Sequence, residues 1–304
     1  MSNLTEQIEQ ACEVQESHGV IERVLKPKTK DLGGFSVRRV LPTIHQKKVG
    51  PWVFLDHMGP VTFPEGKGVD VRPHPHIGLA TVTYLFEGEV LHRDSLGNAL
   101  WVRPGEINLM VAGRGIVHSE RKRPESDTTS NRLHGLQMWL ALPESMEDID
   151  PAFYHYAEKD IPLVNINGVA VRLLIGAAYG ATSPVKMFAD TLYLEATLMQ
   201  GQHLEIPDAE ERAIYIVSGE LKVDAAVVPE YTMLVLNAEQ KIVVSAVQET
   251  RIAVIGGEKI NPRYIDWNFV SSQKEKIELA KQKWKAGLFE RVPGDENEFI
   301  PLPE

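Results

Sequence analysis

Short runs of alternating hydrophobic and polar residues recur along most of the chain, which is the pattern of half-buried β-strands. Clear runs cover residues 20–25, 35–41, 81–86 and 106–111. Turns that contain glycine and proline, such as the Arg-Pro-Gly at 103–105, separate the runs and would fold antiparallel strands back on one another. The pattern therefore predicts an all-β fold of antiparallel strands.

One segment near the C-terminus has the periodicity of a helix instead. In residues 271–287 the apolar side chains fall on one face, at Ile277, Ala280 and Trp284. Ser271 or Ser272 is the expected N-cap, and Gly287 is the expected C-terminal stop. The acidic and proline-rich residues from Pro293 onward predict an extended or mobile tail behind this helix.

The second half of the chain repeats the first half weakly. The sequence YLFEGEV at 84–90 has a counterpart, YIVSGEL, at 215–221, and each is followed by signals for strand, turn and strand. We therefore expect two β-barrels related by duplication and joined by an acidic linker around 143–151. The expected boundaries are an N-terminal tail at 1–19, a first barrel at 20–145, a second barrel at 151–265, and a helix with an acidic tail at 266–304.

Composition places the 304-residue chain among soluble globular proteins, with 43% hydrophobic and 24% charged residues. No apolar run approaches the length that spans a bilayer, so no membrane partner is expected. A net charge of −10 argues against direct nucleic-acid binding. The acidic N-terminus lacks the regions of a secretory signal, and Cys12 is the single cysteine; both features predict a cytoplasmic protein. The polar surroundings of Cys12 argue against a thiol nucleophile.

Candidate metal ligands stand at both ends of residues 74–120. The sequence HPH at 74–76 opens this stretch and HSE at 118–120 closes it, and side chains two apart on a strand point to the same face. Pro75 should lie at a strand start or a sheet edge, because proline cannot donate to a strand ladder. A meander that returns to its starting point would bring the two motifs together. The sequence therefore predicts a site of three histidines and one carboxylate, formed by His74, His76, His118 and Glu120.

This donor set suits one divalent first-row metal ion and leaves coordination positions open for water, oxygen or a substrate. Such sites are typical of non-haem Fe(II) chemistry, so Fe(II) is the expected metal. Nickel, copper, cobalt, manganese and zinc stay open, since raw affinity does not select iron. In the second half, His203 and Glu205 fall at the position of the first motif, while residues 241–246 supply no ligand at the position of the second. We therefore expect a degenerate second barrel without metal.

The histidines outside these motifs have less specific settings. His57 stands beside Asp56, so it could hydrogen-bond a metal-ligating histidine, or it could serve packing alone. Five others are expected to be structural or simply exposed: His18, His45, His92, His134 and His155.

The motifs at 74–76 and 118–120 resemble those of the pirin family of bicupins. The resemblance is carried by residues 74–97, 104–120 and 133–143. Ordinary cupins have a glutamate four or five residues after their His-x-His, where this chain has Ala80 and Thr81. Pirins instead take the carboxylate from two residues after the third histidine, which here is Glu120. The resemblance implies a bicupin of two jelly-roll (double-stranded β-helix) barrels, with the metal in the N-terminal one.

The resemblance also implies two functions of different class. One is a metal-dependent dioxygenase of the quercetin 2,3-dioxygenase type, which opens flavonols with O₂ and uses Glu120 as a base. A planar aromatic substrate would need a wide pocket, for which we expect a lining of Phe54, Met110 and Met138. The alternative is a regulatory protein, in which the metal or its redox state alters a surface that a metabolic enzyme or a transcription factor binds.

Overall fold

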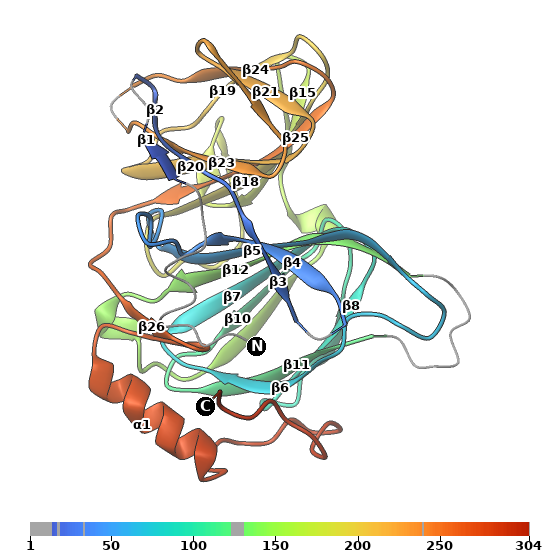
Figure 1. The fold of residues 1–304 in the computed structure, drawn as a ribbon, viewed down its shortest axis with the longest axis vertical. Helices are drawn as coiled ribbons and strands as arrows, with labels where there is room; N and C mark the ends of the chain where they lie inside the picture. Colours follow the sequence, from blue (N-terminus) through green and yellow to red (C-terminus); the bar gives the residue numbers. More distant parts are fainter. Residues whose placement is uncertain (1–13, 17–18, 33, 123–130, 239, 304) are drawn as a thin grey trace.

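The computed structural model describes residues 14–16, 19–32, 34–122, 131–238 and 240–303. Within these ranges the chain is almost entirely β-structure, which confirms the all-β expectation, with one α-helix, α1 (Lys274–Lys285). Two β-barrels are stacked along the long axis of the molecule, and α1 lies against the lower barrel (Figure 1). Cys12 and most of the expected N-terminal tail fall outside the described residues.

The first barrel consists of a larger and a smaller sheet. The larger sheet has the strand order β13-β10-β7-β12-β5-β4-β3. The bounds of its strands are Lys28–Asp31 for β3, Ser36–Leu41 for β4, Trp52–Phe63 for β5, Leu79–Glu87 for β7, Ile107–Val111 for β10, Asn131–Ala141 for β12 and Ala152–Tyr156 for β13. The smaller sheet has the order β6-β11-β8-β9. Its strands are Val71–His76 for β6, Val90–Asp94 for β8, Ala99–Val102 for β9 and Ile116–Arg121 for β11.

The second barrel repeats this arrangement. Its larger sheet has the order β1-β2-β23-β20-β25-β18-β15-β14, and its smaller sheet has the order β19-β24-β21-β22. The larger sheet comprises Val14–Glu16 (β1), Ile21–Leu25 (β2), Leu163–Ile166 (β14), Val169–Ile175 (β15), Thr191–Leu198 (β18), Glu211–Ser218 (β20), Thr232–Leu236 (β23) and Thr250–Gly257 (β25). The smaller sheet comprises His203–Glu205 (β19), Glu220–Val223 (β21), Ala226–Pro229 (β22) and Val243–Ala246 (β24). Two short hairpins complete the strands: Ala177–Ala178 (β16) with Ala181–Thr182 (β17), and Tyr264–Asp266 (β26) with Phe269–Ser271 (β27).

Two strands cross the boundaries that the sequence pattern suggests. β2 lies in the stretch expected to belong to the first barrel, but it pairs with β23 of the second. β13 lies beyond the expected linker, but it pairs with β10 of the first barrel. β10 and β23 hold equivalent places in the two larger sheets, so each exchanged strand satisfies backbone groups that would otherwise form an open sheet edge.

The larger sheets of the two barrels share one hydrophobic core. Trp52 on β5 is fully buried there, and its ring meets Tyr193 of β18 edge-on with 5.7 Å between centroids. The Trp52 indole N–H donates to the backbone carbonyls of Leu192, at 3.2 Å, and Gly256, at 3.1 Å. This one side chain of the first barrel therefore makes both apolar and polar contact with the second.

The helix α1 confirms the helix predicted at 271–287. Ile277 and Ala280 are buried in a small cluster with Ile77 of the first barrel, and Trp284 packs against it. Packing of this apolar stripe fixes α1 to the first barrel. In the described ranges no helix is both long and apolar enough to cross a membrane.

The serine N-cap expected for this helix is wrong. The N-cap is Gln273, which makes no side-chain capping bond. Ser271 and Ser272 instead donate their hydroxyl groups to the buried Glu147 carboxylate, at 2.9 Å and 3.1 Å. A buried carboxylate requires such donors, and this requirement outweighs helix capping here. The expected stop at Gly287 is confirmed, with φ at +66° directly after the helix.

Replacing Trp52 by phenylalanine tests the interface between the barrels. The Trp52→Phe variant should lose about 1–3 kcal/mol of unfolding free energy, since two buried carbonyls lose a donor. Urea unfolding followed by circular dichroism measures the change. Trp101→Phe, on strand β9 of the smaller sheet, is the matched control and should lose less. Equal losses in the two variants would contradict the role given to the Trp52 indole.

Candidate metal centre

Three of the predicted ligands converge inside the first barrel. β6 pairs with β11 in antiparallel register, which places His74 opposite His118 and His76 opposite Ile116. All three histidines are buried, and one ring nitrogen from each lies within 4.8 Å of the other two. One of these separations is 3.1 Å, between Nε2 of His76 and Nε2 of His118. β6 is an edge strand of its sheet, which confirms the edge position expected for Pro75.

Hydrogen bonds fix the orientation of two of these rings. His74 Nδ1 lies 2.9 Å from the Arg72 carbonyl, and His76 Nδ1 lies 3.0 Å from the Asn268 carbonyl. A carbonyl only accepts, so Nδ1 carries the proton in both rings, and Nε2 keeps a free lone pair directed at the centre. His118 Nδ1 is buried and has no partner among the described residues.

Burial keeps these histidines neutral. It lowers the pKa of His74 to about 4, and it lowers the pKa of His76 and His118 well below the ordinary value, with the neighbouring histidines adding to the shift in both. Metal binding requires neutral imidazole. The three ring nitrogens converge, and the one hydrogen bond between them in the described residues is the 3.1 Å contact of His76 with His118. A divalent cation would replace the proton of that contact and accept a lone pair from each ring, so the residues fit a metal ion.

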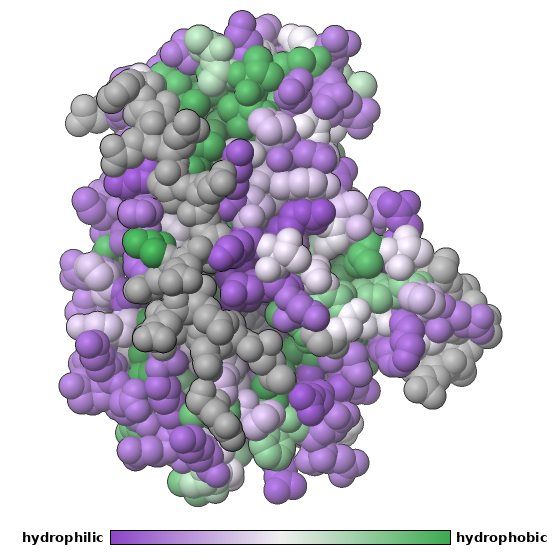
Figure 2. All heavy atoms as spheres, viewed as in Figure 1, coloured by the Kyte–Doolittle hydropathy of each residue, from purple (hydrophilic) through white to green (hydrophobic). Residues whose placement is uncertain are grey.

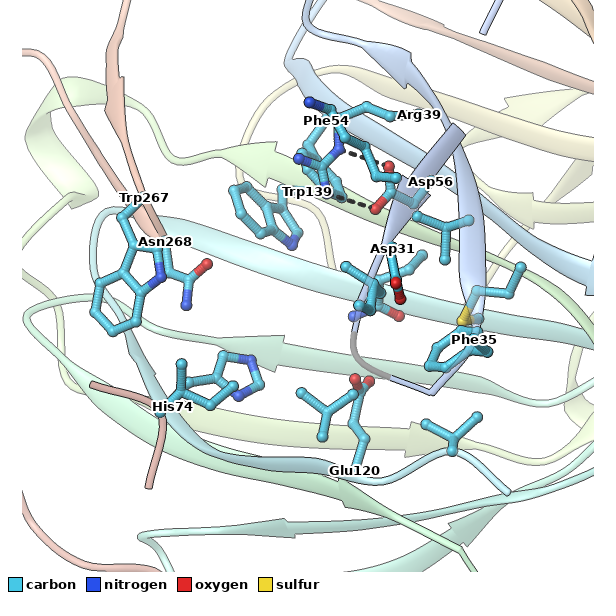
Figure 3. A pocket seen from close by; sticks show the side chains of 18 of the residues that line it. Asp31, Phe35, Arg39, Phe54, Asp56, His74, Glu120, Trp139, Trp267 and Asn268 are labelled. Atoms are coloured by element: carbon cyan, nitrogen blue, oxygen red, sulfur yellow. Dashed lines mark hydrogen bonds and ion pairs between the residues drawn. The ribbon is translucent and has the colours of Figure 1, made fainter. Parts of the chain in front are cut away.

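Glu120 lines the same cavity but stands outside the three-histidine group. The strand pairing of β11 with β6 shifts register between His118 and Glu120, and such a bulge changes the direction of the side chain that follows it. Figure 3 shows the Glu120 carboxylate pointing into the cavity, apart from the His74 ring. Burial raises the pKa of Glu120 to about 7. Its role as a fourth ligand therefore stays a prediction.

The cavity beside the histidines has a volume of about 320 Å³, and its wall combines aromatic, aliphatic and charged side chains. Phe54 stacks on Trp139 with 4.0 Å between centroids, and Trp139 meets the His76 ring edge-on at 5.2 Å. Above them Arg39 and Asp56 form a buried ion pair with two hydrogen bonds of 2.8 Å (Figure 3). The cavity therefore offers flat apolar surface next to the candidate metal ligands.

Comparison with known proteins gives the family of the chain. The family model described as Pirin matches residues 34–140, and the one described as Pirin C-terminal cupin domain matches residues 193–290. The chain belongs to the pirin family. A pirin-like protein of Caulobacter vibrioides is 45% identical over 289 residues, which is 94% of this chain and 100% of that protein.

Solved structures agree with this family. A quercetin 2,3-dioxygenase from Acinetobacter baumannii superposes with a TM-score of 0.86 at 32% identity, over 98% of this chain and 97% of that chain. A bacterial pirin from Escherichia coli in complex with nickel(II) has a TM-score of 0.61 at 22% identity, over 77% of this chain and 96% of that chain. The second likeness shows the fold alone.

Of the three residues expected to line the pocket of this pirin, Phe54 is confirmed, and the predictions for Met110 and Met138 are wrong. Met138 lies between two cavity-lining residues of β12, so strand alternation turns it to the opposite face, into the core between the barrels. Met110 is buried in a hydrophobic cluster behind Phe54. Most residues that line the cavity lie outside β10 and β12, the strands of these two methionines. Several of them belong to segments far from the histidine motifs in sequence.

His57 serves packing between the barrels and does not reach the metal centre. Its Nδ1 lies 2.8 Å from the Tyr215 hydroxyl, and its Nε2 lies 2.8 Å from Nε2 of His134. Burial lowers the pKa of both histidines, that of His134 to about 4. Asp56, the neighbour of His57 on β5, points to the opposite face and pairs with Arg39.

His92 is structural, as expected, but its partner Asp94 and the site residue Asn268 have no place in the sequence prediction. His92 donates a 3.0 Å hydrogen bond from Nε2 to the buried Asp94 carboxylate, and its ring lies 5.4 Å from that of His118. These residues form another pair two apart on a strand, so the spacing that identified the ligands could have identified them too. Asn268, whose carbonyl orients His76, carries no such signal because its side chain does not take part.

Removing one histidine should remove the metal without unfolding this pirin. His74→Ala and His118→Ala should each reduce tightly bound metal from one equivalent to near none, because two imidazoles remain where three converge. Metal analysis after purification gives the stoichiometry, and circular dichroism reports folding, which the hydrophobic cores maintain. Unfolding of either metal-free variant would show that the site is structural.

His203→Ala is the control for the second barrel. His203 and Glu205 are exposed on β19, while Leu204 between them is buried in the second core. The substitution should leave metal content unchanged. A second equivalent of metal that is lost in this variant would overturn the prediction that the second barrel is degenerate.

Proposed function

We propose that this protein is a dioxygenase that opens flavonols such as quercetin, at one divalent metal ion held by His74, His76, His118 and Glu120. The observation that carries the proposal is the convergence of three neutral imidazoles beside a cavity of about 320 Å³ that is partly lined by aromatic side chains. That volume lies at the small end of the range for small-molecule sites. The similarity to a quercetin 2,3-dioxygenase from Acinetobacter baumannii, at 32% identity, supports the choice of substrate.

Fe(II) is the metal we propose, and it would supply open coordination positions together with redox chemistry toward O₂. The three histidines hold the ion, and the carbonyls of Arg72 and Asn268 orient two of them. The same donors would accept nickel, copper, cobalt, manganese or zinc. A solved pirin from Escherichia coli is titled as a nickel(II) complex.

Glu120 is the residue that we propose as the base. Its carboxylate reaches into the cavity from the strand that also carries His118 (Figure 3). A buried carboxylate that faces the substrate cavity can act as a general base toward a bound hydroxyl group. It would accept the proton of the flavonol 3-hydroxyl group, while Phe54 and Trp139 align the planar rings by stacking.

The composition of the cavity wall also bears on the substrate. Trp139 packs edge-on against His76, and Phe54 stacks on Trp139. The Arg39–Asp56 pair is closed on itself by two hydrogen bonds, and Lys30 and Asp31 also line the cavity. The wall therefore places flat rings beside polar groups, which suits a polyphenol.

A regulatory function is the second candidate, and an exposed apolar surface favours it. The second barrel exposes large apolar side chains, among them Leu163, Val227 and Val243, and apolar side chains gather over the upper barrel in Figure 2. A partner protein could bind there, with the metal state of the first barrel altering the affinity. Pull-down experiments with metal-loaded and metal-free protein would show such a dependence.

The enzyme proposal is tested by oxygen uptake. Protein loaded with Fe(II) should consume O₂ when quercetin is added and should release carbon monoxide. The His118→Ala variant, loaded in the same way, should consume none. Iron-loaded protein that leaves quercetin unchanged in air would remove the support for this function.

Glu120→Gln separates the two roles given to this residue. Glutamine has nearly the same size and still offers a carbonyl oxygen to the metal, but it accepts no proton. The variant should keep its metal through the three histidines and lose turnover by about 10²- to 10⁴-fold, the usual contribution of a positioned base. Rates should be compared at equal metal occupancy.

The pH dependence provides the check on this variant. Without the base, the reaction depends on ionisation of the substrate hydroxyl, so raising the pH should restore part of the rate of Glu120→Gln. Equal rates of wild type and variant at neutral pH would leave Glu120 no part in proton transfer.

A further inference from the structure

The end of the chain forms part of the metal cavity. Residues 288–303, which follow α1 and which we name the C-terminal strap, contain neither helix nor strand. The strap runs beside β6 and β11, and the C-terminus lies close to them (Figure 1). Ile300 contributes to the lining of the cavity that also contains His74, His76 and Glu120. A residue more than 220 positions away from the first histidine motif therefore borders the candidate active site.

Two backbone hydrogen bonds hold Ile300 at this place. Its N–H donates to the Pro73 carbonyl at 2.8 Å, directly before the ligand His74. Its carbonyl accepts from the Trp284 indole N–H at 3.0 Å, at the end of α1. Both backbone groups of Ile300 are thus engaged, which fixes the direction of its side chain.

An arginine on the metal-bearing strand anchors the strap a few residues earlier. Arg121 donates to both carboxylate oxygens of Asp295, at 2.6 Å and 2.5 Å, and to Glu298 at 3.2 Å. The Arg121 side chain is only 11% exposed. Charge-assisted pairs with this two-bond geometry are among the strongest polar contacts available to a surface segment.

The residue before Ile300 faces the other way. The Phe299 side chain is 54% exposed, and its ring meets that of Trp284 edge-on at 5.7 Å. It borders a separate cavity between α1 and the strap. Phe299 therefore provides a neighbouring apolar side chain that has no contact with the metal cavity.

We propose that the C-terminal strap is a wall of the active site, in which Ile300 sets the size of the substrate admitted and limits access to the metal. The effect of Ile300 on substrate size rests on the proposed function, whereas its effect on access to the metal does not. The strap has no regular structure, and Phe289, Ile300 and Leu302 pack it against the apolar cluster under α1. The polar contacts of Asp295 and Glu298 hold the segment that leads to Ile300, so their loss should loosen the wall locally.

Metal access is measured first, without any turnover. Nickel(II)-loaded protein is mixed with the coloured chelator 4-(2-pyridylazo)resorcinol, and the rate of metal loss is followed by absorbance. Ile300→Gly and Asp295→Asn should lose nickel faster than wild type, by about tenfold for Asp295→Asn, where charge-assisted bonds are lost. Ile300→Phe, which narrows the opening, should lose nickel more slowly.

Substrate size is measured second, as the ratio of kcat/KM for quercetin to that for quercetin carrying glucose on its 7-hydroxyl group. Ile300→Gly should shift the ratio toward the larger flavonol, and Ile300→Phe should shift it away. Phe299→Ala is the matched control in both measurements and should behave as wild type. Opposite changes in the glycine and phenylalanine variants cannot come from loss of folding.

The outcomes separate this inference from the proposed function. Altered nickel release without any flavonol turnover would support the wall and refute the flavonol reaction. Flavonol turnover with unchanged size preference and unchanged nickel release in the Ile300 variants would refute the wall and leave the reaction standing. Equal effects of Phe299→Ala and Ile300→Gly would also overturn the role given to Ile300.

Discussion

The pairing of β6 with β11 is the constraint on which the metal centre depends. Its register sets His74 opposite His118, and a slip of one residue would turn the histidines of one strand away from the interior. The three ring nitrogens lie within 4.8 Å of one another, and in the described residues one hydrogen bond of 3.1 Å, between His76 and His118, joins them. A bound cation would take a lone pair from all three rings, and metal affinity should therefore be coupled to the pairing of these two strands.

The chain that follows the second barrel completes the site on the first. β27 runs so close to the strand connection after His76 that a Cβ at Gly78 would lie 2.0 Å from the Val270 carbonyl, and Gly78 itself has φ at +68°. Only glycine permits this approach. The approach brings the Asn268 carbonyl to His76 Nδ1, and Ile300 of the strap borders the same cavity. Residues 264–303 are therefore better described as part of the metal-binding unit than as an appendage of the second barrel.

The sequence predicted best the side chains whose positions follow from the two-residue alternation of a β-strand. The spacing of His74, His76 and His118 needed only alternation and one returning meander to predict convergence, and the repeat at 84–90 and 215–221 predicted the duplicated barrel. It was least informative where an irregular feature decides the position. A bulge displaces Glu120 from the histidine group, strands β2 and β13 are exchanged between barrels through non-local pairing, and Ile300 reaches the cavity from a segment without periodicity. Strand alternation also determines the direction of the Met138 side chain, but the sequence does not reveal which face of β12 borders the cavity.

The two barrels share a topology and differ in what fills them. In the second barrel the smaller sheet turns Leu204 inward into an aliphatic core. In the first barrel the equivalent sheet turns histidines inward, opposite a larger sheet that carries the buried Arg39–Asp56 pair. A buried ion pair is often less stabilising than apolar residues of the same volume, so a barrel that keeps a polar cavity gives up part of its own core. The core shared around Trp52 and Tyr193 supplies apolar burial that the first barrel lacks inside, which gives the second barrel a physical role that needs no metal of its own.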